Sequence, residues 1–171
     1  MQSTLLEALL SLWQRSLIEQ HAGRFTLQPV VMEYVTEQFL DRVFTEIKNW
    51  HLERENGYSG QSNHPLFSTH ALIQAQTEDY LRESQIRVLL APLTTRLKHH
   101  FLSPQNLEQH LQRVLSKLRQ QSLAIGYAAG NLINLLHQLG VSLKGYDFSH
   151  LPIRQACLQH AELHQTNFTN A

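Results

Sequence analysis

Eleven histidines and one cysteine are the side chains of this 171-residue chain best suited to bind a metal or act as a nucleophile. A structural zinc site needs paired ligands at short spacing, such as C-x-x-C or H-x₃₋₅-H, in one structural context. The histidines are scattered, and His160 and His164 come nearest to such a pair. A five-residue sequence pattern around them places the two at different phases of neighbouring faces. We therefore expect no metal site and no cofactor bound by this chain alone.

The cysteine, Cys157, has no partner for an intramolecular disulfide, which fits a reducing compartment. Its sequence neighbours offer nothing that would stabilise a thiolate, so a nucleophilic role is not expected. The chain also lacks the G-x-x-x-x-G-K-[ST] loop whose backbone cradles phosphates. The sequence predicts no catalytic residues, and we expect a protein that is not an enzyme and has no ATP affinity of its own.

Charge and hydropathy exclude several partners. Fourteen basic residues balance fourteen acidic ones, so no global field attracts nucleic acid or an anionic membrane. No apolar run approaches the roughly 20 residues of a membrane span. The first stretch, MQSTLLEALLSLW, lacks a basic region and contains Glu7, which is atypical of a signal peptide. The expected location is the cytoplasm.

The first 54 residues predict a helix, a hairpin and a second helix. Thr4 and Glu7 form a capping box that opens the first helix. Two alternating runs around a glycine-containing turn are typical of a β-hairpin, and Pro29 opens the second helix. The predicted bounds are about 4–14 and 29–52 for the helices, 15–19 and 24–28 for the strands, and 55–65 for a loop rich in Gly, Ser and Asn.

The middle of the chain predicts an array of linker helices, so the fold class is mainly α. Ser68 or Thr69 would cap the first of these helices, which Pro92 kinks or breaks. Gly126 and Gly130 lie one helical turn apart and predict close packing inside the array. The array is expected at 66–140, with one helix from Pro104 to about 121 and another from about 123 to 139 before Gly140.

Large apolar residues recur at every fifth position after Gly140. Neither a strand nor a helix has this period. A second set of apolar or small residues precedes the first by two positions, and the other three phases are mostly polar. The first set is Leu143, Phe148, Ile153, Leu158, Leu163 and Phe168, and the second includes Tyr146, Leu151, Ala156 and Ala161.

A chain with this period must turn a corner every five residues and point one large and one smaller residue inwards on each side. Stacked coils then bury a continuous apolar column, whose expected core is the two sets above. The pattern resembles the pentapeptide-repeat family, with AELHQ (161–165) and TNFTN (166–170) as the best matches and Pro152 as a departure. The resemblance implies a four-sided right-handed β-helix that begins within 141–171.

Six repeats make only one and a half coils of such a helix, fewer than a solenoid usually needs to bury its own core. We therefore expect this chain to be a fragment of a longer protein. The helix that ends near Gly140 should cover the first coil. The other end, at Leu163 and Phe168, should fray or be covered by a second copy of the chain in an isologous dimer.

Three further stretches resemble a segment of cyanobacterial signal-transduction ATPases of the NB-ARC type. They are GRFTLQPVVMEYVTEQF, RESQIRVLLAPL and GYAAGNLINLLHQLG, followed by YDFSHL at the start of the repeats. In that family an NB-ARC module leads through a winged helix and helices into pentapeptide units and a WD-repeat propeller. The resemblance implies a winged-helix-like unit at 1–54, and a regulatory or scaffold segment that couples a nucleotide-binding core to a sensor or protein-interaction domain. Its partners would be proteins or other domains of the same longer chain.

The same resemblance points to Gln28 as a cofactor-contacting candidate. NB-ARC winged helices often carry a Met-His-Asp signature after the hairpin, and its His senses the bound nucleotide. The matching positions here are Leu27, Gln28 and Pro29. Gln28 can still donate a hydrogen bond, but Pro29 removes both the acid and a backbone N–H. A polar residue at a strand end is the alternative interpretation of Gln28.

Two nucleic-acid functions are alternatives to the scaffold role. DNA binding by the winged-helix-like unit would rest on Arg15, Arg24 and Lys48, which lie among many acidic residues. DNA mimicry needs a long acidic solenoid, whereas residues 141–171 carry two basic and two acidic side chains. Both alternatives are therefore less well supported than the scaffold role.

Overall fold

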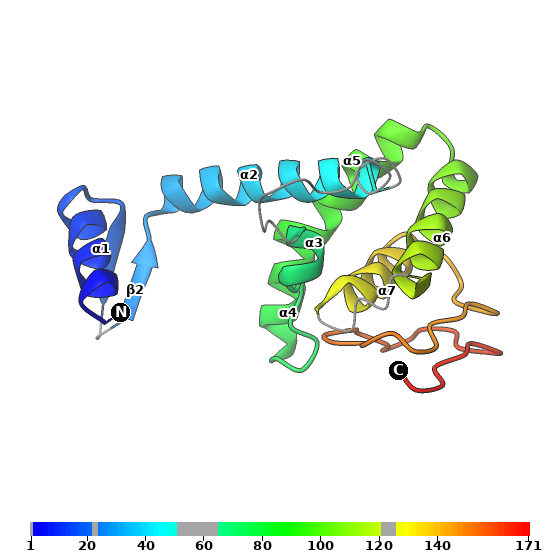
Figure 1. Cartoon of the computed structure of the whole chain (residues 1–171). Coiled ribbons are helices and arrows are strands. Elements are labelled where there is room, and N and C mark those ends of the chain that lie inside the picture. The colour runs from blue at the N-terminus through cyan, green and yellow to red at the C-terminus, as the bar shows by residue number, and fades with distance from the viewer. Residues whose placement is uncertain (1, 22–23, 51–64, 121–125) are drawn as a thin grey trace. The chain divides into compact units, whose positions relative to one another are not determined.

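The computed structural model of this chain describes residues 2–21, 24–50, 65–120 and 126–171 (Figure 1). Contacts divide the chain into two compact units, Met1–Phe39 and Leu40–Ala171, and each is described by itself. The hairpin turn at 22–23, most of the predicted loop at 55–65 and the predicted helix start at 123–125 lie outside the described residues.

The first unit consists of a helix, a hairpin and the start of a second helix. These are α1 (Gln2–Gln14), the antiparallel strands β1 (Ile18–His21) and β2 (Arg24–Leu27), and α2 (Pro29–Lys48). All four elements match the sequence prediction in order and type. Among the described residues of this unit, Ile18 is the only buried apolar side chain.

The boundary between the two units falls inside α2 and not at residue 54, where the sequence predicts it. Leu40, Val43 and Ile47, on the second half of this helix, are buried. The first half has no buried residue. The two halves of one helix therefore differ in the amount of apolar surface that they bury.

The second unit is mainly helical, as predicted. After the end of α2 it contains α3 (Leu66–Thr69), α4 (Asp79–Gln85), the π-helix η1 (Ile86–Leu90), α5 (Ala91–Phe101), α6 (Pro104–Gln120) and α7 (Ala128–Gln138). Pro104 opens α6 as expected. Within the described residues no helix is both long and apolar enough to cross a membrane.

The predicted cap at Ser68 or Thr69 is wrong. Both residues lie inside the single turn of α3, whose first N–H groups, at Leu66 and Phe67, donate to the Glu46 carboxylate at 2.9 Å each. Glu46 lies 20 residues earlier on α2, so a carboxylate distant in sequence caps this turn. The chain is then non-helical until α4 begins at Asp79.

Pro92 disturbs its helix in a specific way. In a regular helix its ring would clash with the carbonyl four residues earlier, and it has no N–H to donate. The residues just before it form η1, and the Ala91 N–H reaches back five residues to the Ile86 carbonyl. The predicted kink or break is therefore a widened turn, after which α5 continues.

Helix α7 is the centre of the second unit. Every residue from Ala128 to Leu136 is buried, which is typical of a helix surrounded by other elements. It contacts α3, α5, α6 and η1. At its end Gly140 has a φ of 74°, and the Val141 N–H donates to the Leu136 carbonyl, as in a Schellman motif. The predicted stop at Gly140 is confirmed.

Candidate functional site

The segment 141–171 turns a corner at every fifth residue. The residue at each corner has a left-handed backbone, with φ between 55° and 76°. At the corners other than Gln155, the next N–H then donates to the carbonyl of the large apolar residue three positions earlier, as Tyr146 does to Leu143 and Leu151 does to Phe148. This is the signature of a type II turn. The corner residues are Gly145, His150, Gln155, His160, Gln165 and Asn170.

Residues twenty positions apart pair with each other. Asp147 and Asn167 form a parallel bridge. The Phe148 N–H donates to the Asn167 carbonyl at 2.8 Å, and the Asn167 N–H donates to the Tyr146 carbonyl at 2.9 Å. Since each side is five residues long, a repeat of twenty residues gives a coil of four sides.

The large residues of the first coil point into its interior. Phe148, Leu143 and Leu151 are 0%, 1% and 3% exposed. The Phe148 ring stacks on that of Phe168, with centroids 5.6 Å apart and planes 10° apart. The other predicted core residues are half-buried, namely Tyr146, Ile153, Ala156, Ala161, Leu163 and Phe168.

Leu158 departs from its predicted place in the core, because it is 37% exposed. The side chain of Phe148 is covered by Phe168, twenty residues later. Leu158 is therefore less covered than Phe148, which has the same phase two repeats earlier.

Helix α7 lies against the first coil, as predicted (Figure 1). The Asn134 side chain donates to the Gln155 carbonyl and accepts from the Cys157 N–H, both at 2.8 Å. At Gly130 the helix comes so close that an added Cβ would lie 1.9 Å from the carbonyl oxygen of Arg154. The predicted close packing inside the helical array holds for Gly126, where a Cβ would lie 2.3 Å from the Ser68 carbonyl oxygen, although Gly126 precedes α7. Gly130 packs closely against the coil and not inside the array.

A second buried asparagine on the same helix holds the other side of the unit. Asn131 donates to the carbonyls of Phe67 and His70 at 2.8 Å each and accepts from the Leu72 N–H at 2.9 Å. Neither asparagine was predicted from the sequence. The available signal was two amides three residues apart in an otherwise apolar helix, since a buried amide needs partners.

Helix α6 contacts the coil through polar side chains. The Tyr146 hydroxyl donates to the Glu108 carboxylate at 3.0 Å and accepts from the Gln112 amide at 3.2 Å. Arg119 pairs with Asp147 at 2.8 Å. Burial raises the pKa of Tyr146 from 10.0 to about 12, with Glu108 acting in the same direction and the Gln112 hydrogen bond opposing it. The phenol is therefore held in its neutral, donating form.

Arg82 of α4 ties the loop before that helix to the coil. Its guanidinium is buried and donates to the carbonyls of Ala75 and Thr77 at 3.2 and 3.3 Å and to the Gln159 side chain at 3.0 Å. It also pairs with Asp79. A charge removed from water in this way is retained only with several partners, so the contact is geometrically specific.

Two open grooves flank the junction between α7 and the coil. The larger, of about 380 Å³, lies between α4, η1, α7 and the coil, and the other measures about 300 Å³. His137 and His160 line both grooves. Across the described parts of the chain, no group of three or more His, Cys, Asp or Glu side chains could hold a metal ion. The nucleophile candidate Cys157 is half-buried beside the larger groove, and its backbone N–H is held by Asn134.

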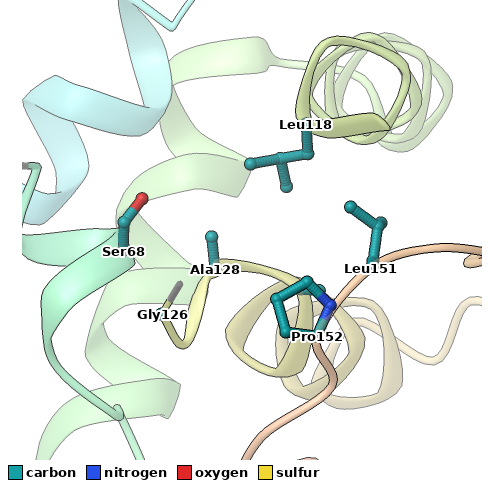
Figure 2. Close-up of a pocket in the computed structure, with 7 residues that line it drawn as sticks. Ser68, Leu118, Gly126, Ala128, Leu151 and Pro152 are labelled. Atoms are coloured by element: carbon teal, nitrogen blue, oxygen red, sulfur yellow. The ribbon is translucent and has the colours of Figure 1, made fainter. Parts of the chain in front are cut away.

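A third cavity shows how tightly α6, α7 and the coil pack. Figure 2 shows Leu118, Ala128 and Leu151 facing one another around it. Its volume is about 10 Å³, which is the size of one water molecule. The cavity therefore has no room for a small-molecule ligand.

The structure places Gln28 between β2 and α2. Its N–H donates to the Leu17 carbonyl at 3.2 Å, and its own carbonyl accepts from the Met32 N–H at 2.8 Å, so its backbone joins the hairpin to the helix. This is a structural role for the backbone. A nucleotide contact by the side chain stays a prediction.

The three basic residues proposed for DNA binding belong to different units. Arg15 and Arg24 are exposed in the first unit, whereas the Lys48 ammonium lies 5.7 Å from the ring centroid of Phe44 in the second. A cation over a ring face interacts with its π-electrons, so Lys48 already has a local partner. This arrangement gives no added support to DNA binding.

Comparison with known proteins finds a relative with WD repeats. A protein of Nostoc sp. named as an uncharacterized WD repeat-containing protein is 45% identical over 189 aligned residues, which cover 98% of this chain and 15% of that protein. No family model matches the chain, and no solved structure gives a significant match. The chain spans about 15% of the length of this curated relative. Over almost the whole of its own length, the chain is therefore similar to one segment of a cyanobacterial WD repeat-containing protein.

Proposed function

We propose that this chain is a non-catalytic regulatory and scaffold segment that couples a nucleotide-binding core to a sensor or protein-interaction domain in a signalling ATPase. In this proposal the first unit is winged-helix-like, and 141–171 begin a right-handed β-helix of pentapeptide repeats. The name of the Nostoc relative supports a role in protein–protein interaction, because WD repeats occur in that protein. The proposed location is the cytoplasm.

The observation that carries the proposal is that two buried asparagines of α7 each hydrogen-bond the backbone of a different neighbouring segment. Asn131 binds the backbone next to α3, and Asn134, one turn further along, binds the backbone of the coil. Buried amides with all partners in place favour one arrangement over others, since moving either side leaves polar groups unpaired in the core. A displacement of the helices would therefore move the coil with them.

The path of coupling begins at the end of α2. The Glu46 carboxylate holds the first turn of α3. The carbonyls of that turn and of His70 are then held by Asn131. From Asn131 the connection passes through α7 to Asn134 and the Cys157 N–H. Apart from the passage along α7 itself, each step is a hydrogen bond between groups distant in sequence, so the path depends on tertiary structure.

Hydrogen exchange tests this coupling in the chain itself. Glu46→Ala should speed exchange of the Leu66 and Phe67 amides because it removes their acceptor. If the coupling is real, exchange of the Cys157 amide should also rise, by about fivefold or more, the lower range of typical coupling energies. Glu83→Ala, at an exposed carboxylate of α4, is the matched control and should change neither.

Two outcomes would contradict the proposal. Faster exchange at Leu66 and Phe67 with no change at Cys157 would mean that α3 and the coil respond separately. An equal rise at the buried amide of Leu111 would indicate general loosening of the unit, and not transmission through α7.

A further inference from the structure

Helix α1 has an unusually wide apolar face. At about 100° per residue, its apolar side chains span an arc of roughly 160°, whereas a helix that packs on one neighbour needs a stripe of about 100°. The polar side chains Glu7, Ser11 and Gln14 share the opposite side. The apolar face is formed by Leu5, Leu6, Leu9, Leu10, Leu12 and Trp13.

Little of this face is covered within the first unit. Leu9 is half-buried, and α1 contacts β1, whose Ile18 is buried. The other five side chains are exposed, and they include Trp13, which lies as close to the centre of the arc as Leu9; the values are Leu5 at 64%, Leu6 at 62%, Leu10 at 49%, Leu12 at 37% and Trp13 at 53%. A two-stranded hairpin is too narrow to cover a face of this width.

The exposed surface is large for so small a unit. These five side chains leave on the order of 500 Å² of apolar area in water, within the range of the largest patch on a typical monomer, and such patches are often functional. An association that covers this face would remove this apolar area from water as well as join two molecules.

The charges on α1 indicate which kind of partner could cover its apolar face. Glu7 is the one charged residue of α1, and it lies on the polar side. Helices that lie on membranes carry Lys or Arg on their polar face, and α1 has neither. An apolar face without charge is complementary to itself, and in an antiparallel pair the two helix dipoles are opposed.

We propose that a second copy of this chain docks on the apolar face of α1, in an isologous dimer with the two α1 helices antiparallel. The open end of the coil is the less favourable place for a second copy, because Leu163 and Phe168 are already half-buried. If α1 faces α1 across a two-fold axis, the total buried area is on the order of 1,000 Å², which is the lower range for specific interfaces. We expect so small an interface to be weak, with a Kd in the micromolar range.

Sedimentation equilibrium of the full chain tests the proposal. The wild type should be a dimer with a micromolar Kd. The double variant Leu6→Glu, Leu10→Glu should raise the Kd roughly 100-fold or more, because it places two charges in the apolar contact. Both side chains are exposed within one chain, so the variant should keep its circular dichroism spectrum.

Three comparisons make the outcome decisive. Ser11→Glu, on the polar side of the same helix, should leave the Kd unchanged, and so should Leu163→Glu at the coil end. A wild-type chain that stays monomeric at about 100 µM overturns the proposal. So does a dimer that Leu163→Glu breaks and the α1 variant does not. A monomer that floats with phosphatidylcholine–phosphatidylglycerol vesicles would mean that lipid covers the face, which also overturns it.

Discussion

Replacing Gly130 by alanine should destabilise this protein, although the same change usually stabilises a helix. Alanine is favoured over glycine in a helix interior by about 1 kcal/mol. Here the added Cβ would lie 1.9 Å from the carbonyl oxygen of Arg154 and 2.9 Å from its carbon, and both are backbone atoms that no rotamer change can move. Helix α7 and the coil must therefore separate.

The expected loss of stability can be derived from the contacts that are disrupted when α7 and the coil separate. Overpacking a core costs about 1–3 kcal/mol. The hydrogen bonds from Asn134 to the Gln155 carbonyl and from the Cys157 N–H to Asn134 lie one turn away and would lengthen. Each contributes about 1 kcal/mol net. After the gain in helix propensity, the net loss in unfolding free energy should be about 2–4 kcal/mol.

Urea denaturation followed by circular dichroism measures this loss. Gly140→Ala is the matched control, because a Cβ there meets nothing within 4 Å and only the left-handed backbone opposes it. That control should lose about 1 kcal/mol. If Gly130→Ala is as stable as the wild type, the close approach of α7 to Arg154 is wrong, and with it the rigid link between helices and coil.

Four further results are expected. In urea denaturation, Phe148→Ala should lower the free energy of unfolding by about 3–5 kcal/mol and Leu158→Ala by less than about 1 kcal/mol, because Phe148 is fully buried and Leu158 is exposed. Equal losses for the two variants would contradict the coil geometry. Asn131→Ala should lower the free energy of unfolding by about 2–4 kcal/mol, since it leaves three backbone groups without their hydrogen-bond partner. An unchanged free energy would contradict the proposed role of Asn131 in holding α7 to the segment around α3. Because the pKa of Tyr146 is raised from 10.0 to about 12, the folded state holds the phenol proton more tightly than the unfolded chain does. This contribution to the free energy of unfolding is fully present below pH 10 and is lost as the pH rises towards 12. Tyr146→Phe should flatten that loss and remove a phenol titration near 12 from the absorbance at 295 nm. Calorimetric titration with ATP or ADP should show no binding, and micromolar affinity would contradict the expectation that this chain alone has no site for a nucleotide.

Local patterns in the sequence were sufficient for the elements that depend on local chemistry. Helix starts at Pro29 and Pro104, the stop at Gly140 and the hairpin all follow from single residues or short alternation, and the structure has each of them. The five-residue spacing of apolar side chains likewise matches the spacing of the left-handed corners. In each case the determining residue and the structure that it forms are neighbours in the chain.

Features that depend on distant residues could not be predicted in this way. Leu72 and Ile73 have helical spacing with later apolar residues, yet they lie in a non-helical loop. The Asn131 side chain, 59 residues away, binds the Leu72 N–H and competes with helix formation there. Leu158 fits the five-residue period perfectly and is still exposed, because burial depends on a neighbouring layer and the period reports only which way a side chain points.

Two of the eleven histidines that first suggest metal chemistry have a backbone role in the coil. His150 and His160 occupy corners with φ of 61° and 59°, and both are exposed. Among residues with a side chain, Asn, Asp and His are the most enriched in this left-handed conformation, and Asn170 takes the same position. Histidine is therefore compatible with a corner of the coil, although Gln155 and Gln165 occupy corners as well. His150 and His160 thus take part in the backbone geometry of the coil, and their places in the sequence need no metal ion to account for them.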